Sequence, residues 1–195
     1  MNIIKKIYPD ISENKLKELK YDTEGLYSIT MPDEAKIISE LILKNIDKNN
    51  IIMDCTAGLG GNSLSFCKYF KKVIAYEINK ERYDILCNNI VLYEHTNISI
   101  YNDNCIDNLN KHICDVYFFD PPWGGPDYKK EQNLSLTLSN KSLNDIVKYI
   151  FNININATVC FKLPYNYNFN EFNNMKYYKK KIKNMVIILI YSIVK

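Results

Sequence analysis

The residues with the clearest chemical potential lie at positions 120–128, which read DPPWGGPDY. Two prolines restrict the backbone here, so they fix the directions of the Asp120 side chain and the Pro121 carbonyl. Both groups accept hydrogen bonds, and together they can hold the two hydrogens of a planar exocyclic amine. An amine held in this way can direct its nitrogen lone pair at a methyl sulfonium while positive charge develops on the nitrogen. The stretch therefore predicts methylation of an amine without a strong general base.

Trp123 adds a flat aromatic face next to the expected amine site. Stacking of a nucleobase on such a face is worth roughly 1 to 3 kcal/mol. A positively charged base would gain a further 0.5 to 2 kcal/mol, approximately, from a cation–π interaction. The alternative is a proline-rich turn with a core tryptophan, which would need no ligand.

A second group of residues, at 54–62, reads DCTAGLGGN and has the form of a strand end followed by a glycine-rich turn into a helix. Such a turn lets the backbone come close to a ligand. Glu77, 23 residues after Asp54, ends the next expected strand and can bind ribose hydroxyls, while Asp103 follows the third. A tight turn with solvated acids, or a nicotinamide dinucleotide site, would use the same pattern. Combined with residues 120–128, the pattern is that of methyltransferases that use S-adenosylmethionine.

The elements that must position these residues follow from hydrophobic periodicity. Short β-like runs alternate with longer amphipathic stretches after residue 50, which predicts an α/β fold with a mostly parallel sheet. We expect strands at 51–54, 73–76, 98–101, 116–119 and 157–161, and helices at 62–70, 80–93 and 142–151, the last with Ser142 as N-cap. Runs at 175–182 and 185–193 predict a C-terminal antiparallel hairpin. Upstream, Pro32 indicates a helix start, and a short helix is expected near 12–20.

Composition limits the class of protein. The 195 residues are 47% apolar, which excludes a largely disordered chain, and the length fits one domain. The formal charge is only 25 − 22 = +3, which does not by itself indicate a nucleic-acid binder. All of the 25 basic residues except Arg82 are lysines. Phosphate would therefore be bound mostly by point charges rather than by the bidentate guanidinium of arginine.

Cysteine usage and hydropathy bear on metal content and location. The six cysteines form no C-x-x-C pair and only two histidines are present, so we expect no zinc site and reduced thiols. No apolar run follows Lys5 and Lys6, which argues against a signal peptide. The longest apolar run, 185–194, is about half of the roughly 20 residues that span a bilayer. We expect an intracellular protein, cytoplasmic or nuclear, that does not contact a membrane.

The chain resembles the trimethylguanosine synthase family, which methylates the guanine 2-amino group of 7-methylguanosine RNA caps. The nine-residue loop at 120–128 is the most specific match. The other matches are Gly60-Gly61-Asn62, the segment from Asp22 to Thr30, Asn88-Asn89, and Leu163-Pro164-x-Asn166. They occur in the right order from about residue 20 to the end. The family's arginine after Leu-Pro is replaced by Tyr165, which removes a phosphate ligand.

The resemblance implies a Rossmann-like class I fold with seven strands and a short helical N-terminal extension. Residues 1–30 would form that extension, a lid over cap and cofactor, and residues 31–195 the methyltransferase domain. It implies catalytic roles for Asp120, Pro121 and Trp123. S-adenosylmethionine would be contacted by Thr30, Asp54, Thr56, Gly58, Gly60, Asn62, Glu77 and Asp103. Substrate contacts would come from Trp123, Tyr128, Ser28, Asn89, Asn166 and Lys6.

The expected reaction yields 2,7-dimethylguanosine, with 2,2,7-trimethylguanosine after a second transfer, and S-adenosylhomocysteine. The expected partner is 7-methylguanosine-capped RNA, and the chain is expected to act as a monomer without a metal. Two alternatives remain: an adenine-N6 methyltransferase on DNA or RNA, and a catalytically silent cap- or RNA-binding module on the same fold. Five lysines between positions 176 and 183 are compatible with RNA contact or with protection of a strand edge.

Overall fold

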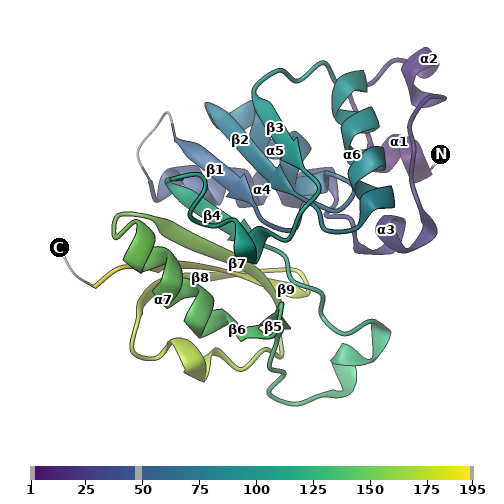
Figure 1. The fold of residues 1–195 in the computed structure, drawn as a ribbon. Helices are drawn as coiled ribbons and strands as arrows, with labels where there is room; N and C mark the ends of the chain where they lie inside the picture. The colour runs from purple at the N-terminus through teal and green to yellow at the C-terminus, as the bar shows by residue number, and fades with distance from the viewer. Residues whose placement is uncertain (1–2, 47–49, 194–195) are drawn as a thin grey trace. The chain divides into compact units, whose positions relative to one another are not determined.

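The computed structural model describes residues 3–46 and 50–193. Contacts divide the chain into two compact units, Met1–Cys105 and Ile106–Lys195. In Figure 1 the colour runs from purple to teal along the first unit and from teal through green to yellow along the second. Both units combine β-strands with helices, as the alternating sequence pattern predicts.

The first unit contains three parallel strands in the order β3-β2-β1. They are β1 (Ile51–Asp54), β2 (Lys72–Tyr76) and β3 (Ile98–Tyr101), connected by helices α5 (Gly61–Tyr69) and α6 (Lys80–Leu92). Figure 1 shows α6 beside β3. Ile52, Met53, Val73 and Ala75 are fully buried, because parallel strands are covered on both faces. The three predicted strands and both predicted helices are confirmed, within one residue at each end.

Four helices precede the first strand: α1 (Ile3–Ile7), α2 (Glu13–Leu16), α3 (Thr23–Ser28) and α4 (Pro32–Lys44). The helix predicted to begin at Pro32 is confirmed, and the one expected near 12–20 is a single short turn. Sequence reasoning missed α1 and α3. The start of α3 carried a signal, since the Asp22 carboxylate caps it by accepting a hydrogen bond from the Gly25 N–H at 2.7 Å.

Asn89 on α6 anchors this N-terminal segment to the first unit. Its side-chain amide accepts a hydrogen bond from the Lys20 N–H (3.1 Å) and donates to the Lys20 carbonyl (2.9 Å) and the Tyr8 hydroxyl (3.2 Å). Burial raises the pKa of the Tyr8 hydroxyl, so it stays protonated. Apolar residues of the segment complete one core with α6: Ile4, Ile7, Tyr8 and Leu19 pack with Leu86 and Ile90. Residues 3–30 are therefore packed into the core of this unit.

Four of the strands in the second unit pair in the order β4-β7-β9-β8. They are β4 (Val116–Phe119), β7 (Thr158–Pro164), β8 (Lys176–Ile182) and β9 (Met185–Tyr191). Strands β4 and β7 are parallel, and β9 is antiparallel to both β7 and β8. The predicted C-terminal hairpin is confirmed, with Lys183 in its turn at a φ of 51°. The strand expected to end at 161 continues to Pro164.

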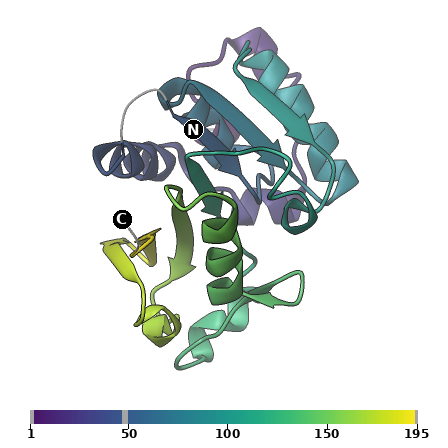
Figure 2. The ribbon, with the colours of Figure 1, turned by 60° about the vertical axis from the view of Figure 1, so that its left-hand side comes forward.

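The remaining elements are short except for one helix. They are the 3-10 helices η1 (Cys105–Asp107), η2 (Pro126–Lys130) and η3 (Phe169–Phe172), the two-residue strands β5 (Thr137–Leu138) and β6 (Lys141–Ser142), and helix α7 (Leu143–Ile153). Figure 2 shows α7, in green, beside the strands of the second unit. The Ser142 hydroxyl accepts a hydrogen bond from the Asp145 N–H at 3.1 Å, which confirms the predicted N-cap. Within the described residues, no helix has the length and apolar character needed to cross a membrane.

We predict that Asn89→Ala lowers the free energy of unfolding by about 2 kcal/mol, because the buried Tyr8 hydroxyl and the Lys20 backbone lose their partner. The comparison variant is Asn88→Ala, which removes donors to the Glu18 carbonyl near the surface and to the Asn89 side-chain oxygen, but leaves the Asn89 hydrogen bonds to Lys20 and Tyr8 in place. It should change stability by less than about 1 kcal/mol. Urea unfolding measures both. Equal losses would show that the Asn89 amide does not anchor the N-terminal segment.

Candidate functional site

The glycine-rich loop between β1 and α5 has two glycines with different roles. Gly58 has a φ of +54°, and a Cβ added there would meet no atom within 4 Å. A Cβ added at Gly61 would lie only 2.6 Å from the Thr30 carbonyl oxygen. Gly61 is therefore needed for the close approach of α5 to the chain before α4, whereas Gly58 borders open space that a ligand can fill.

Three acids follow the three strands of the first unit, as predicted, and they differ in exposure. Asp54 is fully buried, and its carboxylate accepts hydrogen bonds from the Ser63 hydroxyl (2.6 Å) and the Thr56 N–H (3.4 Å). Asp103 is exposed and accepts a hydrogen bond from the Asn104 N–H. The buried Asp54 carboxylate thus stabilises the conformation of the loop, while the exposed Asp103 carboxylate can contact a ligand.

Glu77 connects the second strand to the loop. One of its oxygens accepts a hydrogen bond from the Gly58 N–H and the other from the Asn79 N–H, each at 2.8 Å. A carboxylate has about four acceptor sites, so the remaining lone pairs can accept from ribose hydroxyls. Ile78, next to Glu77, is 68% exposed although it is apolar. Sequence reasoning missed Ile78, because its exposure cannot be read from a strand pattern.

The N-terminal segment borders the same loop. The Tyr8 hydroxyl lies 3.4 Å from the Leu59 carbonyl, and Gly25 approaches the Leu59 side chain so closely that a Cβ would be 2.5 Å away. Asn62 donates a hydrogen bond to the Thr30 hydroxyl at 2.9 Å, while its buried side-chain amide oxygen has no hydrogen-bond partner among the residues that the structure describes. That oxygen is an acceptor available to a ligand in the loop.

In the second unit, the loop after β4 contains a buried ion pair. The Lys162 ammonium on β7 donates to Asp120 Oδ2 at 2.6 Å, and the two side chains are only 9% and 16% exposed. The same ammonium lies 5.3 Å from the centroid of the Trp123 ring. Lys162 therefore connects both residues that were expected to hold and stack a base. Sequence reasoning missed it, because a lysine inside an apolar strand run gave no motif.

Trp123 and Tyr128 lie together in this loop, with ring centroids 5.2 Å apart at an interplanar angle of 75°. Asn166 stabilises the loop, since its side-chain N–H groups donate to the carbonyls of Tyr128 (2.7 Å) and Glu131 (2.8 Å). The Trp123 indole N–H is buried without a partner among the described residues. The two hydrogen bonds of Asn166 thus give this residue a structural role in the loop.

The other predicted substrate residues lie in the first unit. Ser28 is exposed at the end of α3 and donates to main-chain carbonyls of its own helix, and Lys6 is exposed on α1. Asn89 is fully buried and hydrogen-bonded to the N-terminal segment, which gives it a structural role in this unit, and its contact with substrate stays a prediction. Arg82 pairs with Asp22 (3.5 Å) and Glu24 (2.7 Å) and also serves as an anchor.

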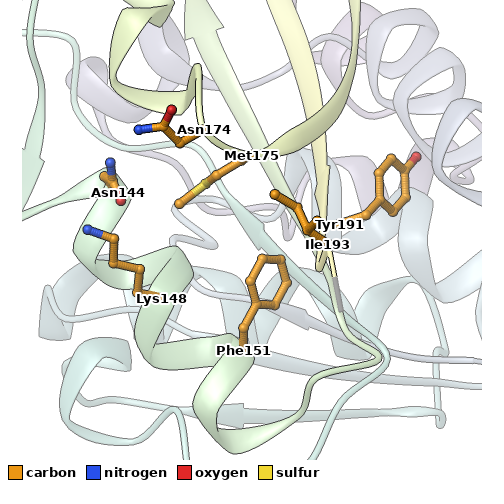
Figure 3. Close-up of a pocket in the computed structure, with 7 residues that line it drawn as sticks. All are labelled: Asn144, Lys148, Phe151, Asn174, Met175, Tyr191 and Ile193. Atoms are coloured by element: carbon orange, nitrogen blue, oxygen red, sulfur yellow. The ribbon is translucent and has the colours of Figure 1, made fainter. Parts of the chain in front are cut away.

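Two hollows are lined by residues other than the predicted site residues, although Gly61, which lies between Gly60 and Asn62, lines one of them. One, of about 260 Å³, lies between α7 and the end of β9 and is drawn in Figure 3. The residues that line it are Asn144, Lys148, Phe151, Asn174, Met175, Tyr191 and Ile193. The other, of about 450 Å³, borders α4, α5 and the N-terminal segment. None of the predicted catalytic, cofactor or substrate residues lines either hollow.

Comparison with known proteins identifies the family. The model of the RNA cap guanine-N2 methyltransferase family matches residues 49–191. The chain belongs to this family. It is 37% identical to an uncharacterized protein of Acanthamoeba polyphaga mimivirus, over 94% of this chain and 83% of that protein. It is 27% identical to the trimethylguanosine synthase of Schizosaccharomyces pombe, over 68% of this chain and 54% of that enzyme. The chain therefore spans about half the length of the fission yeast enzyme.

A solved structure supports the fold. The precorrin-6y C5,15-methyltransferase of Geobacter metallireducens GS-15 has a TM-score of 0.61 at 12% identity, over 90% of this chain and 95% of that chain. The predicted Rossmann-like class I methyltransferase fold, with seven mostly parallel strands, is thus confirmed. The chain is a methyltransferase, and its fold implies S-adenosylmethionine as the methyl donor.

The residues of the glycine-rich loop fit this cofactor. The open space at Gly58 admits a ligand, and Glu77 and Asp103 offer acceptors for hydroxyl and amine groups. The unpartnered Asn62 carbonyl oxygen is a further acceptor. The acceptors on Glu77, Asp103 and Asn62 suit the hydroxyl and amine donors that S-adenosylmethionine carries.

We predict that Gly58→Ala and Gly61→Ala separate cofactor binding from stability. The methyl group at position 58 enters the open space, so affinity for S-adenosylmethionine should fall at least tenfold, while the positive φ reduces stability by about 1 kcal/mol. At position 61 the methyl group meets backbone, so stability should fall by about 1 to 3 kcal/mol. Calorimetric titration and urea unfolding measure the two quantities. Wild-type cofactor affinity in Gly58→Ala would contradict the assigned site.

Proposed function

We propose that the protein transfers a methyl group from S-adenosylmethionine to the exocyclic N2 amine of a 7-methylguanosine RNA cap. The observation that carries this proposal is the arrangement of Asp120, Lys162 and Trp123 in a chain of the cap guanine-N2 methyltransferase family. The likeness to the trimethylguanosine synthase of Schizosaccharomyces pombe supports it. The products would be 2,7-dimethylguanosine and, after a second transfer, 2,2,7-trimethylguanosine.

Asp120 is the proposed acceptor for the amine. The Lys162 ammonium donates to Oδ2 of this carboxylate. The Asp120 carboxylate would accept one N–H of the base, and the Pro121 carbonyl would accept the second. Because the ammonium holds the carboxylate in one orientation, the amine nitrogen would be fixed before reaction. S-adenosylmethionine, when bound, supplies an electrophilic methyl group. The amine nitrogen would form a bond to that methyl carbon as the carbon–sulfur bond of the donor breaks, and the amine proton would leave to solvent.

Trp123 is the proposed stacking platform. Lys162 lies over one face of the indole, so the opposite face is the one on which a base would stack. A 7-methylguanine carries a fixed positive charge, and its stacking on an electron-rich ring adds a cation–π contribution to base stacking. This preference would distinguish a methylated cap from an unmethylated guanine.

The remaining predicted residues have proposed roles in binding. The cofactor site would be formed by Thr30, Asp54, Thr56, Gly58, Gly60, Asn62, Glu77 and Asp103. The substrate would be contacted by Ser28, Lys6 and Tyr128, and residues 1–30 would serve as a lid.

The decisive experiment incubates the protein with labelled S-adenosylmethionine and a short RNA that begins with a 7-methylguanosine cap, an unmethylated guanosine cap or a 5′ triphosphate. We expect label in the 7-methylated substrate only, at guanine N2, as identified by mass spectrometry of the nucleosides. A matched RNA rich in adenine serves as the test for adenine-N6 transfer. Equal labelling of methylated and unmethylated caps, label in adenine, or no labelling would overturn the proposed specificity.

A further prediction concerns Lys162 as a residue that positions Asp120. Lys162→Met should lower kcat at least tenfold, because the carboxylate loses the ammonium that orients it, with little change in the KM for S-adenosylmethionine. The variant should also be less stable by about 3 to 5 kcal/mol, as expected when one partner of a buried pair is removed.

A double-mutant cycle with Asp120→Asn separates positioning from general damage. If Lys162 acts through Asp120, adding Lys162→Met to the Asp120→Asn variant should reduce kcat little further. Fully multiplicative losses in kcat would show that Lys162 acts independently of Asp120.

A further inference from the structure

The edge strand of the second unit carries an unbalanced positive charge. Strand β8 lies at the end of the strand order in this unit, and Lys176, Lys179, Lys180 and Lys181 are all exposed on it. None of these four lysines forms an ion pair with a carboxylate among the residues that the structure describes. The sequence has no acid after Glu171. The charge of this strand is therefore available to an anionic partner.

The two faces of β8 differ in what lies next to the lysines. Side chains alternate along a strand, so Lys179 and Lys181 share one face, and Lys176 and Lys180 share the other. The Lys179 ammonium lies 5.1 Å from the Phe169 ring centroid, and the Lys181 ammonium lies 6.0 Å from the Tyr165 ring centroid. In the described part of the chain, Lys176 and Lys180 have no such aromatic neighbour. The face of Lys176 and Lys180 also carries a ring, Tyr178, which is 44% exposed. Among the described residues of β8, however, ammonium groups lie over rings only on the face of Lys179 and Lys181.

The aromatic residues of that face are tied to the loop after β4. Asn166, next to Tyr165, donates to the carbonyls of Tyr128 and Glu131. A parallel bridge pairs Tyr167 with Leu134 in the same region. The segment that carries Tyr165 and Phe169 is therefore joined by hydrogen bonds to the segment that follows the proposed cap-binding loop.

We propose that Lys179, Lys181, Tyr165 and Phe169, which we name the β8 strip, bind the single-stranded RNA that follows the cap. This inference rests on the proposed function. Ammonium groups beside accessible rings suit single-stranded nucleic acid, since the cations contact phosphates while the rings stack on bases. Of the two rings here, Tyr165 is exposed and Phe169 is half-buried. Tyr165 is 47% exposed, which leaves much of its ring free for stacking. Protection of a sheet edge also uses lysines, but it requires neither aromatic neighbours nor one particular face.

The test compares two double variants that remove the same charge from opposite faces of β8: Lys179→Gln with Lys181→Gln, and Lys176→Gln with Lys180→Gln. The probes are a 7-methylguanosine cap dinucleotide, a capped RNA of ten nucleotides and the same RNA without a cap. Binding is measured by competition at several salt concentrations. Wild-type protein should bind the capped ten-nucleotide RNA more tightly than the cap dinucleotide.

The variant of the β8 strip should lose at least fivefold in affinity for the capped RNA and keep its affinity for the dinucleotide. The slope of the logarithm of affinity against the logarithm of salt concentration should fall in magnitude by about 1.4, which corresponds to two phosphate contacts on a single strand. The opposite-face variant should remain within twofold of wild type. Equal losses of affinity in both variants, or no gain in affinity from RNA length in the wild type, would overturn the proposal that the β8 strip binds RNA.

A variant without charge change provides an independent check should the lysine variants aggregate. Tyr165→Leu should weaken binding of the capped RNA at least threefold through lost stacking, and the dependence of affinity on salt should not change. Wild-type affinity of this variant for the capped RNA would contradict the proposal. Failure of the proposed function has a different signature, namely no binding of the cap dinucleotide by any form of the protein. Binding of uncapped RNA that depends on Lys179 and Lys181 would, in that case, still support the strip.

Discussion

The ion pair between Lys162 and Asp120 is the interaction on which the rest of the proposed substrate site depends. Both groups are largely removed from water, so neither charge is tolerable there without the other. The pair requires a lysine in the middle of an otherwise apolar strand and a carboxylate at the end of its parallel neighbour, β4. This requirement fixes the start of the loop at 120–128. Trp123 is then held under the same ammonium, so the side chains expected to bind and stack a base share one anchor.

The first unit depends on close backbone approach. Gly61 allows the start of α5 to contact the Thr30 carbonyl, and Gly25 allows α3 to pack on Leu59. Both contacts connect the N-terminal segment to the glycine-rich loop. The segment therefore cannot move without exposing the loop and breaking the hydrogen bonds of Asn89. Because it is packed in this way, a role as a lid would involve displacement of short pieces such as α3, rather than release of the whole segment.

Much of this architecture could be predicted from the sequence, because strands buried on both faces read as short apolar runs between glycine-rich or polar turns. The runs at 51–54 and 116–119 match β1 and β4 at both ends, and the run at 98–101 matches β3, an edge strand that is only half-buried. The short helices before residue 30 were harder, since their stability comes from packing on α6 rather than from their own propensity. Lys162 and Ile78 escaped prediction for a related reason. Whether a lysine is buried or an isoleucine exposed depends on contacts that no local pattern encodes.

The scarcity of arginine connects the site to the surface around it. Arg82, the single arginine, pairs with Asp22 and Glu24, so it serves the fold of the first unit. Any phosphate must then be bound by lysines, which carry no planar fork and give little geometric selection. Precision has to come from groups with fixed geometry, and in the second unit these are Trp123, Tyr128 and Tyr165. Lysines that lie beside rings, such as Lys179 and Lys181, therefore combine the attraction that ammonium groups provide with an orientation that they cannot provide alone.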